Sequence, residues 1–218
     1  MGVSIKNLVL LRHGEAQINA GRRKADSSRP QPLRYSATNE RSPLTKTGKK
    51  QAVAVAKALK KEFGKFDIIF VSPYLRTRQT AALIKKYVPY PKMIVDDKIR
   101  ERSMGRLELL THKGVRIKFP GEYRRILREG TYHYRPPNGE SFSDVQERIF
   151  SFMDDSRLKG NVLIITHGAD IACLMEYQEH FPPARLIQIN NGINICSATC
   201  YSRGRKGLKR RFYNKIYY

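Results

Sequence analysis

Residues 8–15 read Leu-Val-Leu-Leu-Arg-His-Gly-Glu, and residues 162–168 repeat the arrangement as Val-Leu-Ile-Ile-Thr-His-Gly. Short, continuous apolar runs are typical of strands that are buried on both faces of a parallel sheet. The carboxyl ends of such strands face the ligand crevice of α/β folds, and a glycine there lets the backbone approach a ligand. We therefore expect two neighbouring strands that place His13 and His167 side by side in one pocket, with Gly14 and Gly168 at its edge.

The rest of the chain alternates between short apolar runs and segments of helical period. Residues 68–71 form a third continuous apolar run, and the apolar residues between 52 and 59 recur at helical spacing. This alternation predicts an α/β fold with a mostly parallel sheet. The sequence further predicts helices from Ser72-Pro73 to about Tyr87, after the capping-box residues Ser141 to Asp144, and from His167 to about His180, and later strands at 186–189, 193–201 and 208–213.

The composition fits one domain that spans residues 1–218, because this length and a hydrophobic content of 40% suffice for one sizeable core. No apolar run approaches the roughly 20 residues of a membrane span. The apolar stretch at 5–11 is too short for a signal peptide, so we expect a cytoplasmic protein that does not contact a membrane. Cys173, Cys196 and Cys200 are an odd number without metal-ligand spacing, which predicts buried free thiols and no metal site.

The charge is unusually positive, with 42 Lys and Arg against 19 Asp and Glu and a formal net charge of +23. Such a field attracts acidic ligands and polyanions. The excess is concentrated in residues 21–50, with nine basic side chains, and in 203–218, with seven basic side chains and no acid. The second segment is either a final strand or a basic tail. Its basic and aromatic residues are interleaved, as in tracks that bind single-stranded RNA.

Arg76 adds a fixed positive charge to the two histidines. It lies in the first turn of the helix that is expected after Ser72, where the helix N-terminus already favours an anion. Alone, each histidine is equally consistent with a satisfied core imidazole, and Arg76 alone fits a solvated surface arginine better than a binding residue. Together they favour a phosphoryl-transfer site, in which one histidine attacks and the other donates a hydrogen bond to the phosphoryl oxygens.

Five motifs in order carry a resemblance to a known family. Taken together, they resemble the signature of the histidine phosphatase (phosphoglycerate mutase-like) superfamily, and they extend over residues 8 to about 175. They are Arg12-His13-Gly14-Glu15 with Asn19, Leu44-Thr45 with Gly48 and Gln51-Ala52, Ser72-Pro73 with Arg76 and Gln79-Thr80-Ala81, Glu101-Arg102 with Gly105, and Thr166-His167-Gly168.

The resemblance implies a three-layer α/β/α sandwich and a transient phosphohistidine, formed without a metal or another cofactor. By position in the motifs, His13 corresponds to the nucleophile, and Arg12, Arg76 and His167 to the groups around the phosphoryl oxygens. Glu101 corresponds to the general acid, which protonates the leaving oxygen and then takes a proton from water. Positive donors suit this reaction because charge is spread over three equatorial oxygens in the transition state.

Other segments are less tightly defined by the resemblance. Asn19 matches a further phosphate-contacting position. The chain departs from the family pattern after Glu101, so we carry over no substrate contacts for 106–114. Residues 21–42 are long for a minimal phosphatase and form either a basic lid or a disordered loop. The stretch 134–148 is similar to phosphatase-type members.

Three functions remain open at this stage. The leading one is a phosphatase that acts on a small, anionic phosphorylated substrate. The second is a mutase that returns the phosphoryl group to another hydroxyl; the short segment between Glu101 and Pro136 argues against it, because the glycolytic mutases carry a longer insertion. The third is a module that binds RNA or another polyanion through 203–218 without turnover. The sequence does not indicate an oligomeric state.

Overall fold

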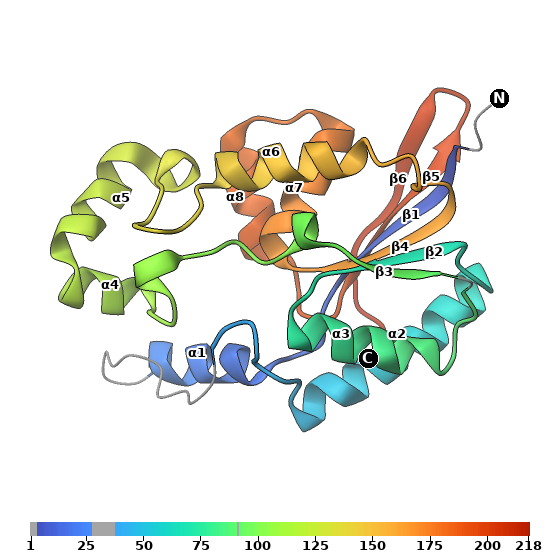
Figure 1. Ribbon diagram of the computed structural model, residues 1–218, viewed down its shortest axis with the longest axis horizontal. Helices are drawn as coiled ribbons and strands as arrows, with labels where there is room; N and C mark the ends of the chain where they lie inside the picture. Colours follow the sequence, from blue (N-terminus) through green and yellow to red (C-terminus); the bar gives the residue numbers. More distant parts are fainter. Residues whose placement is uncertain (1–3, 28–37, 91) are drawn as a thin grey trace.

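The computed structural model describes residues 4–27, 38–90 and 92–218. A six-stranded sheet runs through its centre in the order β3-β2-β4-β1-β5-β6 (Figure 1). Strands β3, β2, β4 and β1 are parallel, β5 is antiparallel to β1, and β6 is antiparallel to β5. The sheet is therefore mostly parallel, as predicted. The strands are β1 (Ile5–Arg12), β2 (Ile68–Val71), β3 (Met93–Val95), β4 (Gly160–Thr166), β5 (Ala198–Gly204) and β6 (Gly207–Lys215).

Helices cover both faces of the sheet (Figure 1). On one face, α2 (Lys46–Phe63) and α3 (Leu75–Lys85) pack on the alternate β1 side chains Val9 and Leu11. On the other face, α6 (Phe142–Met153), α7 (Gly168–Glu179) and α8 (Pro183–Gly192) pack on Leu8 and Leu10. Successive strand side chains point to opposite faces, so β1 contributes to two separate cores. This arrangement confirms the three-layer α/β/α sandwich.

The remaining helices gather beyond the carboxyl ends of the central strands (Figure 1). They include α5, which is interrupted at Gly130 where φ is +74°. Two of these helices, over 112–133, were not predicted from the sequence. These elements are α1 (Gln17–Ser27), η1 (Asp97–Ile99), η2 (Gly105–Leu107), α4 (His112–Lys118) and α5 (Pro120–His133).

Several local predictions are confirmed. Ser141 and Asp144 form a complete capping box at the start of α6, and the helix after His167 is α7. The two parallel strands that end in the histidines are direct neighbours, with Arg12 of β1 opposite Thr166 of β4. The three cysteines are free and buried.

Two local predictions were wrong. Residues 186–189 are not a strand but lie within α8, because Pro182 and Pro183 start a helix there and Leu186 and Ile189 bury one of its faces at a spacing of three residues. The helix after β2 begins at Leu75 rather than at Pro73, and Tyr74 is its N-cap. Ser72 lies before the cap position, and its hydroxyl accepts from Tyr74 N at 3.4 Å and contacts His167 Nε2 at 2.8 Å.

The basic segment 203–218 forms the edge of the sheet instead of a free tail. Most of it lies in β6, which pairs with β5. Phe212 and Tyr217 pack against the core, and Tyr217 donates a hydrogen bond to Glu62. Among the described residues, no helix is long and apolar enough to cross a membrane.

Candidate active site

His13 follows β1 directly and is buried. Its backbone N–H donates to Thr166 O at 3.1 Å, which ties it to the end of β4. Its Nδ1 lies 2.7 Å from Gly14 O, and its Nε2 lies 3.0 Å from Arg76 Nε. A carbonyl only accepts and an arginine Nε only donates, so the hydrogen resides on Nδ1 and Nε2 carries a lone pair.

The surroundings keep the His13 ring neutral. Burial, and then the positive charge of Arg76, hold the pKa of His13 well below its usual range. A neutral imidazole with an unprotonated Nε2 is the form in which histidine acts as a nucleophile, and here that lone pair accepts from Arg76 Nε.

Gly14 lets helix α2 approach this end of β1. A Cβ on Gly14 would lie 2.5 Å from Gly48 O, and one on Gly48 would lie 2.0 Å from Glu15 O. The two backbones therefore approach so closely that a side chain at either position would collide with the other backbone. The Gly14 N–H donates to Thr80 Oγ1 at 3.1 Å, which links the histidine loop to α3 as well.

His167 follows β4 and is the N-cap residue of α7. Its ring centroid lies 5.1 Å from that of His13, so the two histidines do meet as predicted. Its Nδ1 lies 3.2 Å from Arg76 Nη2 and 3.3 Å from a Glu101 carboxylate oxygen. Burial lowers the pKa of His167 to about 4, although Glu101 acts in the opposite direction. His167 is therefore neutral near pH 7.

Arg76 connects these groups, and it is 1% exposed. Besides the bond to His13, Nη1 donates to Asn39 O at 2.7 Å and to Asn39 Oδ1 at 3.1 Å. Nη2 lies 3.4 Å from Glu101 Oε2. The guanidinium also lies over the Tyr74 ring, 4.8 Å from its centroid. A rigid cation thus stands between the two histidines and the carboxylate.

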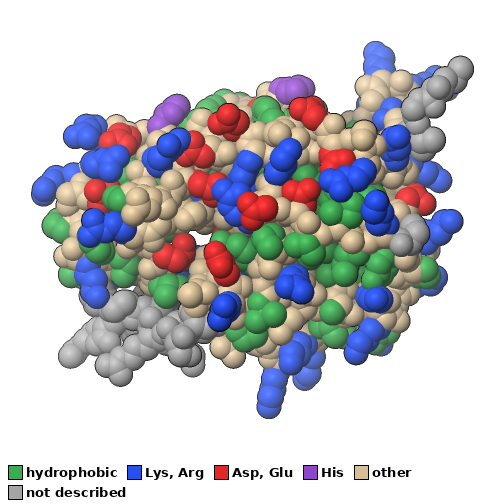
Figure 2. All heavy atoms as spheres, viewed as in Figure 1, with side chains coloured by type: hydrophobic (Ala, Val, Ile, Leu, Met, Phe, Trp, Pro, Cys, Tyr) green, Lys and Arg blue, Asp and Glu red, His purple; other side chains and the backbone are tan. Residues whose placement is uncertain are grey.

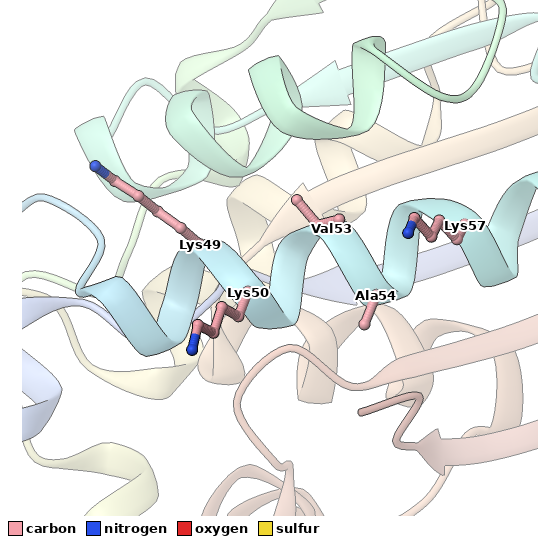
Figure 3. Close-up of a pocket in the computed structure, with 5 residues that line it drawn as sticks. All are labelled: Lys49, Lys50, Val53, Ala54 and Lys57. Carbon is pink, nitrogen blue, oxygen red and sulfur yellow. The ribbon is translucent and has the colours of Figure 1, made fainter.

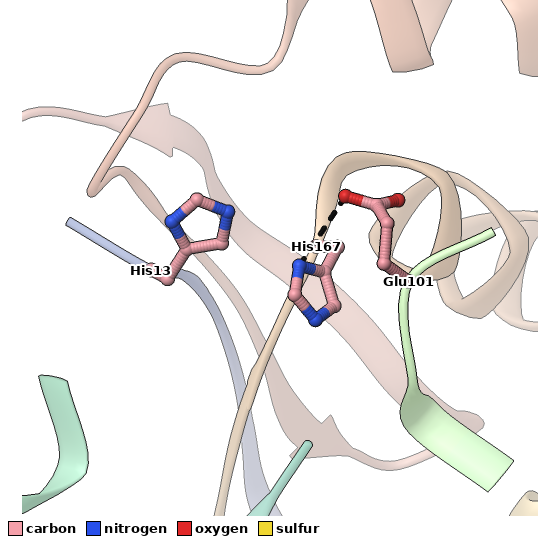
Figure 4. Close-up of side chains that lie close together, drawn as sticks. All are labelled: His13, Glu101 and His167. Atoms are coloured by element: carbon pink, nitrogen blue, oxygen red, sulfur yellow. Dashed lines mark ion pairs between the residues drawn. The ribbon is translucent and has the colours of Figure 1, made fainter. Parts of the chain in front are cut away.

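Glu101 reaches the site from the segment between η1 and η2, and its carboxylate points toward His167 (Figure 4). Burial opposes its ionisation, but the neighbouring His167 and Arg76 outweigh burial and hold the pKa of Glu101 well below its usual range. Without substrate, Glu101 is a carboxylate.

Glu140 holds the backbone on both sides of Glu101. Its carboxylate accepts from Arg100 Nη2 at 2.5 Å and from Ser103 N at 3.0 Å. Its own backbone N–H donates to Ser103 O at 2.9 Å, and its carbonyl accepts from Arg102 Nε at 2.8 Å. Glu140, which precedes the Ser141 cap of α6, therefore holds the segment that carries Glu101.

His13, Glu101 and His167 are also the one cluster among the described residues whose side-chain types and spacing suit a metal ion, with ligand atoms within 4.8 Å of one another. Arg76 contacts all three: Nε faces His13 Nε2, and Nη2 faces His167 and Glu101. A divalent cation bound by these three residues would be repelled by the positive charge of the Arg76 guanidinium. The donor set therefore fits an anion held by Arg76 better than a metal.

Arg12 lies at the same end of β1. Its Nη1 donates to Ile193 O at 2.5 Å, and its buried Nε has no hydrogen-bond partner in the described ranges. Gly168 is close to it, since a Cβ there would lie 3.8 Å from Arg12 Cζ. Asn19 is engaged locally, because its Oδ1 accepts from Ala16 N at 3.0 Å. In the part of the chain that the structure describes, no hydrogen bond joins Asn19 to the histidines or to Arg76.

A cavity of about 680 Å³ opens beside this cluster. Its walls carry four arginines against two glutamates, so it suits an anionic ligand. It brings together residues from α1, the Glu101 segment, α6, α7 and α8. The lining residues are Arg12, Arg22, Arg23, Asn39, Glu101, Arg102, Met104, Glu108, Thr131, Phe142, Gly168, Ala169, Asn190 and Asn191.

Sequence reasoning missed several residues of this site. Asn39, Arg22 and Glu108 have no local signal, since only folding brings them near Arg76 and Glu101. Arg102 lay within a quoted motif but received no role, and Ser72 was predicted only as a helix cap, not as a partner of His167. Of the segment 21–42, the structure places residues up to Ser27 in α1, while the interpretation of 28–37 as lid or disordered loop lies outside the described residues.

The positive charge is distributed widely over the surface. Figure 2 shows Lys and Arg side chains over the whole visible face, with acidic side chains among them. A second hollow on α2 is lined by Lys49, Lys50, Val53, Ala54 and Lys57 (Figure 3). In 203–218, Arg210 pairs with Glu179, and Arg211 and Lys215 pair with Glu62. These contacts, and the packing of Phe212 and Tyr217, leave fewer free groups for RNA than the sequence indicates.

Comparison with known proteins gives a consistent result. Residues 8–215 match the family described as the histidine phosphatase superfamily (branch 1). The phosphoglycerate mutase of Schizosaccharomyces pombe is 33% identical over 175 residues, which is 77% of each chain. Human 6-phosphofructo-2-kinase/fructose-2,6-bisphosphatase 3 is 30% identical over 176 residues, or 80% of this chain and 30% of that longer protein. The α-ribazole phosphatase from Shigella flexneri shares the fold with a TM-score of 0.73 over 96% of both chains at 20% identity.

Proposed function

Because the chain belongs to the histidine phosphatase superfamily (branch 1), we propose that it is a phosphatase that hydrolyses a small anionic phosphoester through a phosphohistidine on His13. The observation that supports this most directly is the contact of 3.0 Å between His13 Nε2 and Arg76 Nε. It places a neutral nucleophilic nitrogen against a buried cation, which is what attack on an anionic phosphoryl group requires.

In the proposed first step, His13 Nε2 attacks phosphorus, and the bond from phosphorus to the leaving oxygen breaks. Arg76, Arg12 and His167 stabilise the charge on the phosphoryl oxygens. Glu101 gives the leaving oxygen its proton. The bound phosphoester adds negative charge beside Glu101 and draws Arg76 toward itself, and both effects raise the pKa of this carboxyl from its low value in the free protein.

In the second step, water attacks the phosphorus of phosphohistidine. The Glu101 carboxylate takes a proton from that water, the nitrogen–phosphorus bond breaks, and inorganic phosphate leaves. His13 returns to the neutral form that burial favours.

A mutase is the second candidate, favoured by the similarity to the Schizosaccharomyces pombe enzyme. It shares the first step but transfers the phosphoryl group back to a hydroxyl of the bound intermediate. Phosphatase is preferred because the segment between Glu101 and Pro136 holds only η2, the 7-residue α4 and the 14-residue α5, whereas the glycolytic mutases carry a longer insertion.

The test measures phosphate release from a panel of sugar phosphates, phosphoglycerates, nucleotides and inositol phosphates, and follows isomerised products by NMR. Brief exposure to substrate should leave an acid-labile, base-stable phosphoryl group on the protein. His13→Ala should lose both label and turnover, whereas His112→Ala, at an exposed position on α4, should keep both. A label that persists without His13 contradicts the proposal, and isomerisation without phosphate release favours the mutase.

A further inference from the structure

Arg102 is a buried cation that has no carboxylate partner among the described residues. Its side chain belongs to a residue that is 9% exposed, and it lines the cavity directly after Glu101. No carboxylate in the described part of the chain lies within ion-pair distance of it, whereas Arg100, two residues before it, pairs with both Asp97 and Glu140. Buried charges in proteins are normally paired, because leaving water without compensation is costly.

The position of the Arg102 guanidinium is determined by neutral groups. Nε donates to Glu140 O at 2.8 Å, Nη2 donates to Tyr134 O at 3.2 Å, and Cζ lies 4.3 Å from the centroid of the Phe142 ring. These two bonds use two of the five N–H donors of an arginine, so three remain. The side chain is thus held rigidly beside the cavity with donors to spare, which is how a planar guanidinium recognises carboxylate or phosphate.

Arg22 of α1 makes a second, independent contribution to the same cavity. Its Nε is buried without a hydrogen-bond partner, one of two such side-chain atoms among the described residues, the other being Arg12 Nε. Its Nη2 is 3.6 Å from Glu108 Oε1, an oxygen that already accepts from Asn39 Nδ2 at 3.0 Å. Glu108 therefore only partly compensates Arg22.

We infer that Arg102 and Arg22 form an anion-binding subsite for the leaving-group half of the substrate, so that the substrate is a phosphoester with a second anionic group, a carboxylate or another phosphate. This inference rests on the proposed function, since it takes Arg12, Arg76 and His13 as the site of the transferred phosphoryl group. Arg102 adjoins Glu101, the proposed donor to the leaving oxygen. A group bound by Arg102 therefore belongs to the alcohol that leaves.

The experiment compares three alkyl phosphates of equal chain length whose far end carries a hydroxyl, a carboxylate or a second phosphate. The protein should prefer the carboxylate or the phosphate compound to the neutral one, and the better of the two identifies the second group. Arg102→Met removes the guanidinium, including its contact with the Phe142 ring, but keeps an unbranched apolar side chain. Loss of a charged hydrogen bond of about 1.5–3 kcal/mol predicts a decrease of kcat/KM by about 10- to 100-fold for the doubly anionic substrate.

Two comparisons separate this subsite from the phosphoryl site. Arg102→Met should lower kcat/KM for the doubly anionic alkyl phosphate far more than for the neutral alkyl phosphate of equal length, because only the former loses a charged partner. Arg106→Met, an exposed arginine of the same segment, should leave all substrates unaffected. Arg22→Gln on α1 tests the subsite without touching the packing on Phe142, and should reproduce the selective loss.

Equal losses for neutral and doubly anionic substrates in both Arg102→Met and Arg22→Gln would overturn the subsite, as would a preference for the neutral compound. Failure of the proposed function looks different: no substrate would release phosphate, and no phosphohistidine would form in the unaltered protein.

Discussion

Arg76 Nε donates its hydrogen to His13 Nε2 across 3.0 Å. The atom that we propose as the nucleophile is therefore covered by the cation that we propose for the phosphoryl group. Substrate binding must separate them, because Nε2 forms the bond to phosphorus. A phosphoryl oxygen is the natural replacement partner for Arg76, since it is a charged acceptor and the imidazole is neutral.

Arg76→Ala should lower kcat/KM by about 100- to 1000-fold, the usual cost of removing a donor that stabilises developing charge. Steady-state kinetics on any hydrolysed substrate measures this. Arg78→Ala provides the control, because Arg78 lies on the same helix but is exposed. Similar losses in the two variants would show that net charge, rather than the contact to His13, is responsible.

The buried histidines should make stability depend on pH. The folded-state pKa of His13 lies well below the usual histidine range, and that of His167 is about 4, with burial the largest cause for both. Their neutral forms are favoured in the fold, so this contribution to stability is complete above the unfolded pKa of about 6.5. It is lost as the pH falls from there through about 4.

Urea unfolding of the protein at pH 7, 5 and 4 should show this loss. His13→Asn removes one of the two groups and should lose less stability over the same range. His112→Asn, at an exposed position, should behave like the unaltered protein. Identical slopes for His13→Asn and His112→Asn would contradict the buried neutral histidine.

Glu101→Gln tests the general acid. It should slow the hydrolysis of alkyl phosphates by about 100-fold or more, the scale of general acid catalysis, and aryl phosphates far less, since a good leaving group scarcely needs the proton. Glu147→Gln, an exposed position on α6, is the matched control. Equal losses on alkyl and aryl substrates would argue against the role of Glu101.

Glu140→Gln tests whether Glu140 positions Glu101. The Glu140 carboxylate holds Arg100 and Ser103 on either side of Glu101. We therefore expect Glu140→Gln to slow the hydrolysis of alkyl phosphates more than that of aryl phosphates, as Glu101→Gln does, but by a smaller factor. Formation of the phosphohistidine from an aryl phosphate should continue. A uniform loss on all substrates, in step with a loss of stability, would show that Glu140 only supports the fold.

Turnover should persist in excess chelator, since Arg76 already faces the three residues that could otherwise bind a metal. Phosphate release is measured before and after dialysis against EDTA, with and without added Mg²⁺, Mn²⁺ or Zn²⁺. Activity that disappears and returns with one of these ions would refute the metal-free mechanism.

The sequence by itself determined the two histidine-bearing strands. The apolar runs before Arg12 and Thr166 have no polar face, so they must be buried as central parallel strands, and their ends then meet at one edge of the sheet. The capping box at Ser141 was likewise readable, because the hydrogen bonds that form it are local. The helix over 186–189 was not predicted, because a short apolar run fits either a strand or a helix. The two prolines before it start α8.

Only the tertiary structure decided the contacts between distant segments. Arg76 was placed at a helix N-terminus by its sequence, yet nothing local showed that its guanidinium bridges His13, His167 and Glu101. Ser72 has the signature of a cap, but packing β2 beside β4 brings its hydroxyl to His167 instead. Arg102 differs from an ordinary surface arginine because the fold buries it with no carboxylate partner in the part of the chain that the structure describes. Burial is a property of the packed chain rather than of its local sequence.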